Sequence, residues 1–131
     1  MAVQVVTVSG CKQIIKITNK QFAALCAEYN KCYKLIDAIK EIPYFKPVGA
    51  SADVLNVLLQ HFTAFKTDLD KTIDELVKRL RRAENYKKTH VILNPLTGMR
   101  MEHMANLIIY LREVSFEVEK IILELKAIFE K

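Results

Sequence analysis

Apolar residues recur at steps of three and four over most of this chain, which is the spacing of one face of an α-helix. The clearest runs lie in residues 51–88 and 99–129, and a shorter one lies in 18–42. Prolines and glycines, which interrupt helices, number only 3 each. The pattern therefore predicts an all-α fold, an elongated antiparallel bundle of three long helices.

The second and third predicted helices each carry one continuous apolar face. In the second, the steps alternate until Phe65, Leu69 and Ile73, where two steps of four follow each other. Such a stutter locally unwinds a supercoil, so we expect straightening or a bend near Lys66–Asp70, and if the helix breaks there, the bundle has four helices. The core face expected for the third helix comprises Met104, Leu107, Ile108, Leu111, Val114, Val118, Ile122 and Leu125.

The N-terminal part of the chain has a different character. Residues 1–17 are rich in β-branched side chains, which suit extended chain, and Ser9-Gly10 divides them. This favours a β-hairpin, which must pack on the helices because an isolated hairpin is marginally stable in water. The first helix then begins at Thr18, with Gln21 three residues later completing a capping box.

Composition narrows the class of protein. The chain has 131 residues, of which 51% are hydrophobic and 27% charged, so we expect residues 1–131 to form a single globular domain. No run of about 18 apolar residues occurs, which argues against a transmembrane helix. The first residues lack the basic region and apolar core of a secretory signal, so the protein is expected to stay where it is made.

The common catalytic and metal-binding motifs are missing from the sequence. No Glu has a His three positions later, no Gly-rich phosphate loop occurs, and no G-x-S-x-G occurs. The three cysteines, Cys11, Cys26 and Cys32, are interpreted as small core residues. We therefore expect no enzyme activity, no catalytic residues, no metal site and no cofactor.

A basic segment closes the second predicted helix. Residues 78–88 (KRLRRAENYKK) contain six Lys or Arg and one Glu. The structural explanation is that cations suit a helix C-terminus and pair with carboxylates four residues away. The functional explanation is phosphate contact without sequence preference. The nucleic-acid-binding candidates are Lys71, Lys78, Arg79, Arg81, Arg82, Lys87 and Lys88.

The third predicted helix carries a second apolar row. Ile109, Phe116 and Leu123 recur at seven-residue intervals, and Ala105 and Ala127 extend the row. A helical wheel places it about 150° from the core face. Two explanations compete: the N-terminal hairpin or the VILN linker covers the row within one molecule, or another subunit covers it, most often by two-fold symmetry.

In its length, its Ile/Lys/Glu-rich helices, its lack of Trp and its KRLRRAENYKK segment, the chain resembles the small helical virion proteins of viruses of hyperthermophilic archaea, such as the Acidianus two-tailed virus. The resemblance implies a structural role in the virion, with assembly in the host cytoplasm. We therefore expect a non-enzymatic structural or assembly protein, whose partners are copies of itself, other virion proteins or nucleic acid. The alternatives are a small regulatory nucleic-acid-binding protein and a helical scaffold or adaptor.

Overall fold

The computed structural model describes residues 7–89 and 95–131 of the chain, and these residues are almost entirely helical. The predicted all-α bundle is confirmed, and no strand occurs in the described residues. The helices are α1 (Val8–Lys31), α2 (Tyr33–Glu41), α3 (Gly49–Thr89) and α4 (Pro95–Phe129).

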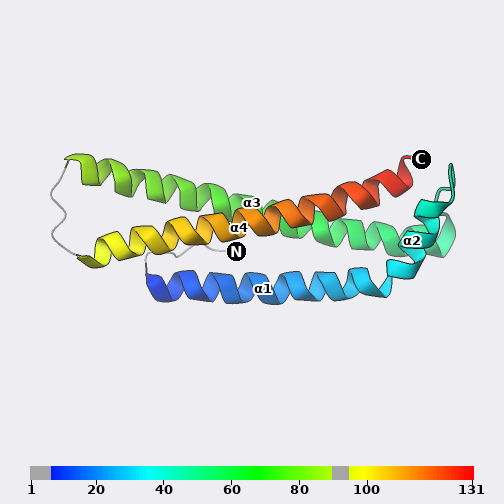
Figure 1. Cartoon of the computed structure of the whole chain (residues 1–131), viewed down its shortest axis with the longest axis horizontal. Coiled ribbons are helices and arrows are strands. Elements are labelled where there is room, and N and C mark those ends of the chain that lie inside the picture. The colour runs from blue at the N-terminus through cyan, green and yellow to red at the C-terminus, as the bar shows by residue number, and fades with distance from the viewer. Residues whose placement is uncertain (1–6, 90–94) are drawn as a thin grey trace.

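The helices form an elongated bundle (Figure 1). α3 and α4 run antiparallel as a long hairpin, α1 lies along them in the same direction as α4, and α2 turns across one end. At 1.5 Å per residue, the 24 residues of α1 span about 36 Å and the 41 residues of α3 about 61 Å. The α3–α4 hairpin therefore extends past the start of α1, at the end that carries the basic segment 78–88.

One apolar core runs the length of the bundle. Every residue of the core face predicted for the third helix is buried, and α3 contributes Leu55, Phe62 and Leu76, each at 0% exposure. The three-and-four spacing places these side chains on one stripe per helix, and the stripes meet along the hairpin. The rest of the buried core comprises Cys11, Ile14, Ile36, Ile39, Leu58, Leu69, Ile73 and Ile128.

The predicted N-terminal hairpin is wrong, because residues 8–17 belong to α1. The capping residue is Thr7, whose hydroxyl accepts a 3.0 Å hydrogen bond from the Gly10 amide, and Thr18 is buried inside the helix. Cys11, Ile14 and Thr18 follow one another at steps of three and four, so a helix buries them together. This packing outweighs the weak extended preference of the β-branched residues. Residues 1–6 of the proposed hairpin lie outside the described residues.

The predicted first helix, 18–42, is divided at Cys32. The Cys32 backbone has φ −98° and ψ 1°, and its amide donates to the Tyr29 carbonyl at 3.0 Å, which closes a tighter turn than an α-helix. The change of direction lets Ile36 and Ile39 be buried at the end of the bundle, where α2 contacts α4. The described chain therefore has four helices, but the division lies between α1 and α2.

α3 is one continuous helix through Lys66–Asp70, so the break that would have given four helices does not occur there. Polar contacts surround the stutter. Lys66 Nζ lies 2.6 Å from Asp70 Oδ2 and 3.6 Å from Glu119 Oε2 on α4, and the hydrogen bond to Asp70 raises the pKa of the Lys66 ammonium. The Ser115 hydroxyl donates to Asp70 Oδ1 at 2.7 Å. The irregular apolar spacing is thus accommodated by a polar bridge between α3 and α4.

α4 begins at Pro95, earlier than the predicted start at 99. Proline suits the first turn of a helix because the amide hydrogen that it lacks would have no helical partner there. The second predicted helix, 51–88, differs from Gly49–Thr89 by two residues at its start and one at its end. These small differences leave the predicted core faces unchanged.

Candidate functional site

The second apolar row of α4 is exposed in the described part of the chain. The exposed fractions are 55% for Ile109, 62% for Phe116 and 56% for Leu123, while Ala127 is exposed and Ala105 partly buried. Residues 8–17 form α1, so they do not form the hairpin that was one candidate to cover the row. The other candidate within one molecule, the VILN linker at residues 91–94, lies outside the described residues. The row therefore lies on the outer side of a helix whose opposite face is fully packed.

Phe116 lies at the centre of this row and beside a shallow groove. Lys120 Nζ lies 4.6 Å from the centroid of the Phe116 ring, and the same ammonium lies 3.3 Å from Glu117 Oε1. A cation over an aromatic face is held by the ring quadrupole, so this lysine covers one face of the ring. The groove beside the ring has a volume of about 360 Å³ and is lined by Phe22, Glu113, Val114, Phe116 and Glu117. It can receive a side chain from a partner.

The basic segment lies on the outer side of α3. Lys71, Lys78, Arg81, Arg82 and Lys88 are exposed and Arg79 is partly buried, while the side chain of Lys87 lies outside the described residues.

Carboxylates counter part of the charge of this segment. Lys78 Nζ lies 3.1 Å from Asp74 Oδ2, which is one of the predicted ion pairs four residues apart. Arg81 and Arg112 line a groove of about 440 Å³ together with Asp70 and Asp74. Arg82, Lys71 and Lys88 are therefore the better candidates for contact with an external anion.

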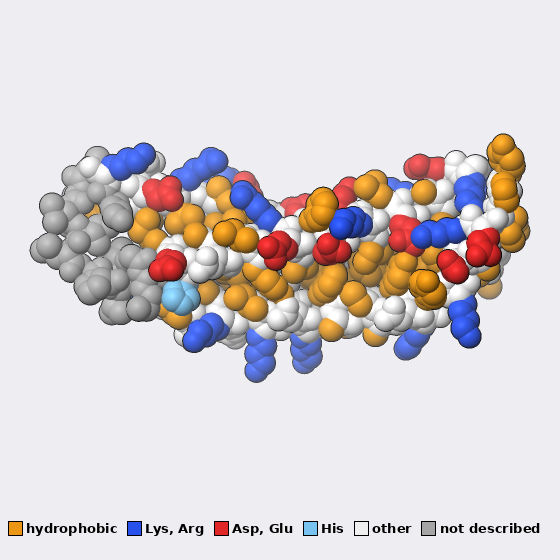
Figure 2. Space-filling model, in the orientation of Figure 1, with side chains coloured by type: hydrophobic (Ala, Val, Ile, Leu, Met, Phe, Trp, Pro, Cys, Tyr) orange, Lys and Arg blue, Asp and Glu red, His pale blue; other side chains and the backbone are white. Residues whose placement is uncertain are grey.

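Three lysines of α1 form a basic row that the sequence reasoning missed. Lys12, Lys16 and Lys20 are all exposed. In Figure 2, Lys and Arg side chains project along the lower edge of the molecule, where Figure 1 places α1. Their four-residue spacing is visible in the sequence, but it places the three lysines on one face only if residues 8–17 form a helix. We call Lys12, Lys16 and Lys20 the α1 lysine row.

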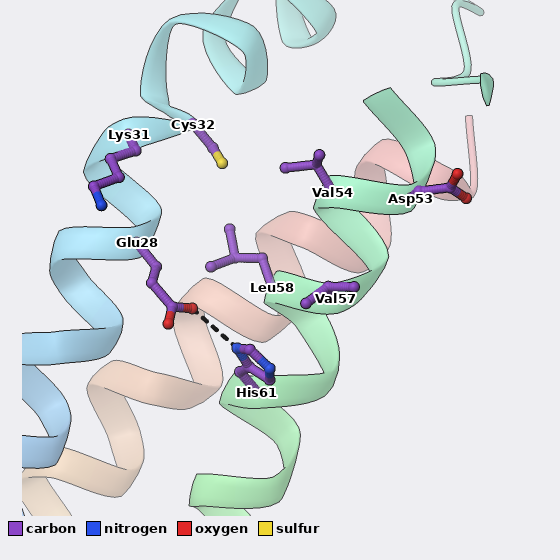
Figure 3. A pocket seen from close by; sticks show the side chains of 8 residues that line it. All are labelled: Glu28, Lys31, Cys32, Asp53, Val54, Val57, Leu58 and His61. Atoms are coloured by element: carbon purple, nitrogen blue, oxygen red, sulfur yellow. Dashed lines mark hydrogen bonds and ion pairs between the residues drawn. The ribbon is translucent and has the colours of Figure 1, made fainter. Parts of the chain in front are cut away.

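A larger groove lies between α1 and α3, near the turn at Cys32 (Figure 3). Its volume is about 620 Å³, and Val54, Val57 and Leu58 give it an apolar wall. Glu28 and His61 meet at its edge, with Oε2 and Nδ1 3.0 Å apart. The remaining lining residues are Lys31, Cys32 and Asp53.

The potential metal ligands are dispersed over the described residues. No group of three or more His, Cys, Asp or Glu residues among them is placed to hold a metal ion. Burial raises the pKa of the Cys11 and Cys26 thiols, which disfavours the reactive thiolate. None of the described helices has a stretch apolar enough to cross a membrane. The features that stand out are surfaces for binding.

Comparison of the chain with models of known protein families found no match, and neither did comparison with curated proteins or with solved structures. The functional interpretation therefore rests on the surfaces of the molecule itself.

Proposed function

We propose that this protein is a non-enzymatic structural or assembly protein that self-associates through the outer apolar row of α4. The observation that carries the proposal is the exposure of Ile109, Phe116 and Leu123, each more than half exposed, at regular seven-residue intervals. A helix that is apolar on two sides is normally packed on two sides. A second copy of the row offers a matching surface, since two-fold dimers use the same patch on both subunits.

The size of the row indicates a weak contact. Full burial of a Leu or Phe side chain contributes about 1.5–3 kcal/mol, so burying the exposed half of each residue contributes about 0.8–1.5 kcal/mol. Two rows of three residues then give about 5–9 kcal/mol. Association itself costs about 4–15 kcal/mol in lost rigid-body freedom. We therefore expect a weak dimer that forms only at high protein concentration. In a larger assembly, many such weak contacts would act together.

Light scattering over a range of protein concentrations tests the proposal with the variant Phe116→Asp. A carboxylate at the centre of the row makes its burial unfavourable, so we expect the mass to remain that of a monomer at concentrations where the unmodified protein dimerises. The matched control is Val48→Asp, just before α3, where the valine is 74% exposed and lines none of the described grooves, and this variant should dimerise normally. An unmodified protein that stays monomeric throughout, or a Phe116→Asp variant that still dimerises, would contradict the proposal.

The proposed function includes contact with nucleic acid through the basic segment. Its support is the exposure of Arg82 and Lys88 in this segment, with the exposed Lys71 on the same helix before it. Such contacts to phosphate carry no sequence information, and their affinity falls steeply with salt. Selective binding to one sequence in excess competitor DNA would instead favour a small regulatory protein. The place of the protein in a virion is a proposal supported by the resemblance in composition alone.

A further inference from the structure

The α1 lysine row differs from several other lysines of the molecule, which are paired with carboxylates. Lys40, Lys66 and Lys78 each lie within 4 Å of a carboxylate, with N–O distances of 2.6, 2.6 and 3.1 Å. Within the described part of the chain, no carboxylate pairs with Lys12, Lys16 or Lys20. The sequence explains this difference, because the first acidic residue of the whole chain is Glu28.

The three ammonium groups lie on one side of a rigid helix. Residues four apart are rotated by about 40° from each other, so Lys12 and Lys20 diverge by about 80° and remain on one side. At 1.5 Å per residue they span about 12 Å along the axis. One strand of a nucleic-acid duplex carries a phosphate about every 3.4 Å of its axis. The row therefore matches a short run of phosphates without rearrangement of the helix.

The burial of α1 decides between two anionic partners, a nucleic acid and a membrane surface. A lysine-rich helix binds a membrane interface by inserting its apolar face among the lipids. In α1 that face is already used, because Cys11, Ile14 and Thr18 are buried against the other helices at 3%, 7% and 0% exposure. Among the exposed residues of this part of α1, Ile17, at 38% exposure, is the one large hydrophobic side chain, and the three lysines carry the charge. Charge alone suits a nucleic-acid backbone, in which phosphates are dense and regularly spaced.

We propose that the α1 lysine row is a binding site for the phosphate backbone of duplex nucleic acid, separate from the basic segment of α3. The two surfaces belong to different helices, and in Figure 2 basic side chains project along the edge formed by α1 while others gather over α3 on the opposite edge. The α1 site stands independently of self-association through α4. It rests on the proposed contact with nucleic acid and adds to it a second basic surface, whose lysines have no carboxylate partner among the described residues.

The test is a salt titration of binding to random-sequence duplex DNA, with the triple variant Lys12→Gln, Lys16→Gln, Lys20→Gln. Glutamine has nearly the helix propensity of lysine, so circular dichroism should show unchanged helicity. Each phosphate contact contributes about 0.9 to the slope of log affinity against log salt, so the loss of three should reduce the slope by about 2.7. At 0.1 M salt, relative to 1 M, this slope corresponds to a fall in affinity of about 500-fold.

The matched control removes the same charge from exposed lysines elsewhere, with Lys34→Gln, Lys46→Gln and Lys126→Gln. It should change affinity far less. Equal losses of DNA affinity in the two variants would overturn the α1 site. The site would also be overturned if the three lysines were needed for binding to vesicles of anionic phospholipid while the protein did not bind DNA. A third variant, Arg79→Gln with Arg81→Gln and Arg82→Gln, tests the basic segment by itself. Unchanged binding in that variant would remove the α3 contact from the proposed function and leave the α1 site intact.

Discussion

Two buried threonines show how single polar groups are accommodated in this bundle. Thr72 is 2% exposed, and its hydroxyl donates to the Asp68 carbonyl at 3.0 Å. Thr18 is 0% exposed, and its hydroxyl has no hydrogen-bond partner among the described residues. A buried hydroxyl without a partner costs about 1–3 kcal/mol relative to one that keeps its hydrogen bond to water. Removing the Thr18 hydroxyl should therefore stabilise the folded protein.

We predict that Thr18→Val raises the free energy of unfolding by about 1–2 kcal/mol, because valine has nearly the same shape and no group to desolvate. The matched control is Thr72→Val, which loses an existing hydrogen bond and should be neutral or destabilising. Urea unfolding followed by circular dichroism measures both. Destabilisation by Thr18→Val would show that the hydroxyl has a partner.

At the scale of elements, a polar contact fixes α1 and α2 against α4. The Tyr29 hydroxyl donates to Glu124 Oε1 at 2.6 Å, and Lys40 Nζ lies 2.6 Å from the same oxygen. Burial, followed by the hydrogen bond to Glu124, raises the pKa of Tyr29 above its ordinary value. The folded state therefore holds the tyrosine proton more tightly than the unfolded state does. This gives the contact between α1 and α4 a dependence on pH.

We predict that the folded protein loses stability as the pH rises above about 10, the ordinary pKa of tyrosine in an unfolded chain. Below that pH the contribution of Tyr29 is fully present, because both states keep the proton. Tyr29→Phe should lower the unfolding free energy by about 1 kcal/mol at pH 7 and flatten the decline at high pH. Unfolding in urea at pH 7 to 11 measures both effects. Tyr44→Phe is the control, since Tyr44 is 91% exposed, and an equally steep decline in Tyr29→Phe would contradict the assignment.

At the scale of the whole molecule, each proposed contact belongs to a different helix of one long bundle. α4 presents the apolar row, α1 presents the lysine row, and α3 presents the basic segment. The proposed self-association through α4 would therefore leave the other two surfaces accessible. This arrangement suits a protein that joins copies of itself while it contacts a polyanion.

We predict that the melting temperature rises with protein concentration, because an association that occurs only in the folded state stabilises it by mass action. The Phe116→Asp variant should show a melting temperature independent of concentration. Val48→Asp should behave like the unmodified protein. Differential scanning calorimetry over a hundredfold range of concentration measures the effect, and a constant melting temperature for the unmodified protein would count against self-association.

The sequence by itself determined the helices that a local pattern of apolar residues predicts. The core face from Met104 to Leu125 and the bounds of α3 follow from a three-and-four spacing that needs no knowledge of neighbours. The exposed row of Ile109, Phe116 and Leu123 could be located in the same way, because its place on the wheel is fixed by the helix.

Only the tertiary structure decided the N-terminal third of the molecule. Residues 8–17 have side chains that suit either strand or helix, and burial of Cys11 and Ile14 against the long hairpin selects the helix. The turn at Cys32 follows from the burial of Ile36 and Ile39 at the end of the bundle. No proline or glycine at this position predicts it from the sequence. The α1 lysine row depends on the same choice, since its residues share a helical face only once packing has made the segment a helix. Local spacing of apolar residues thus determines α3 and α4, which pack along their whole length. Contacts between distant parts of the chain determine α1, its turn into α2, and the α1 lysine row.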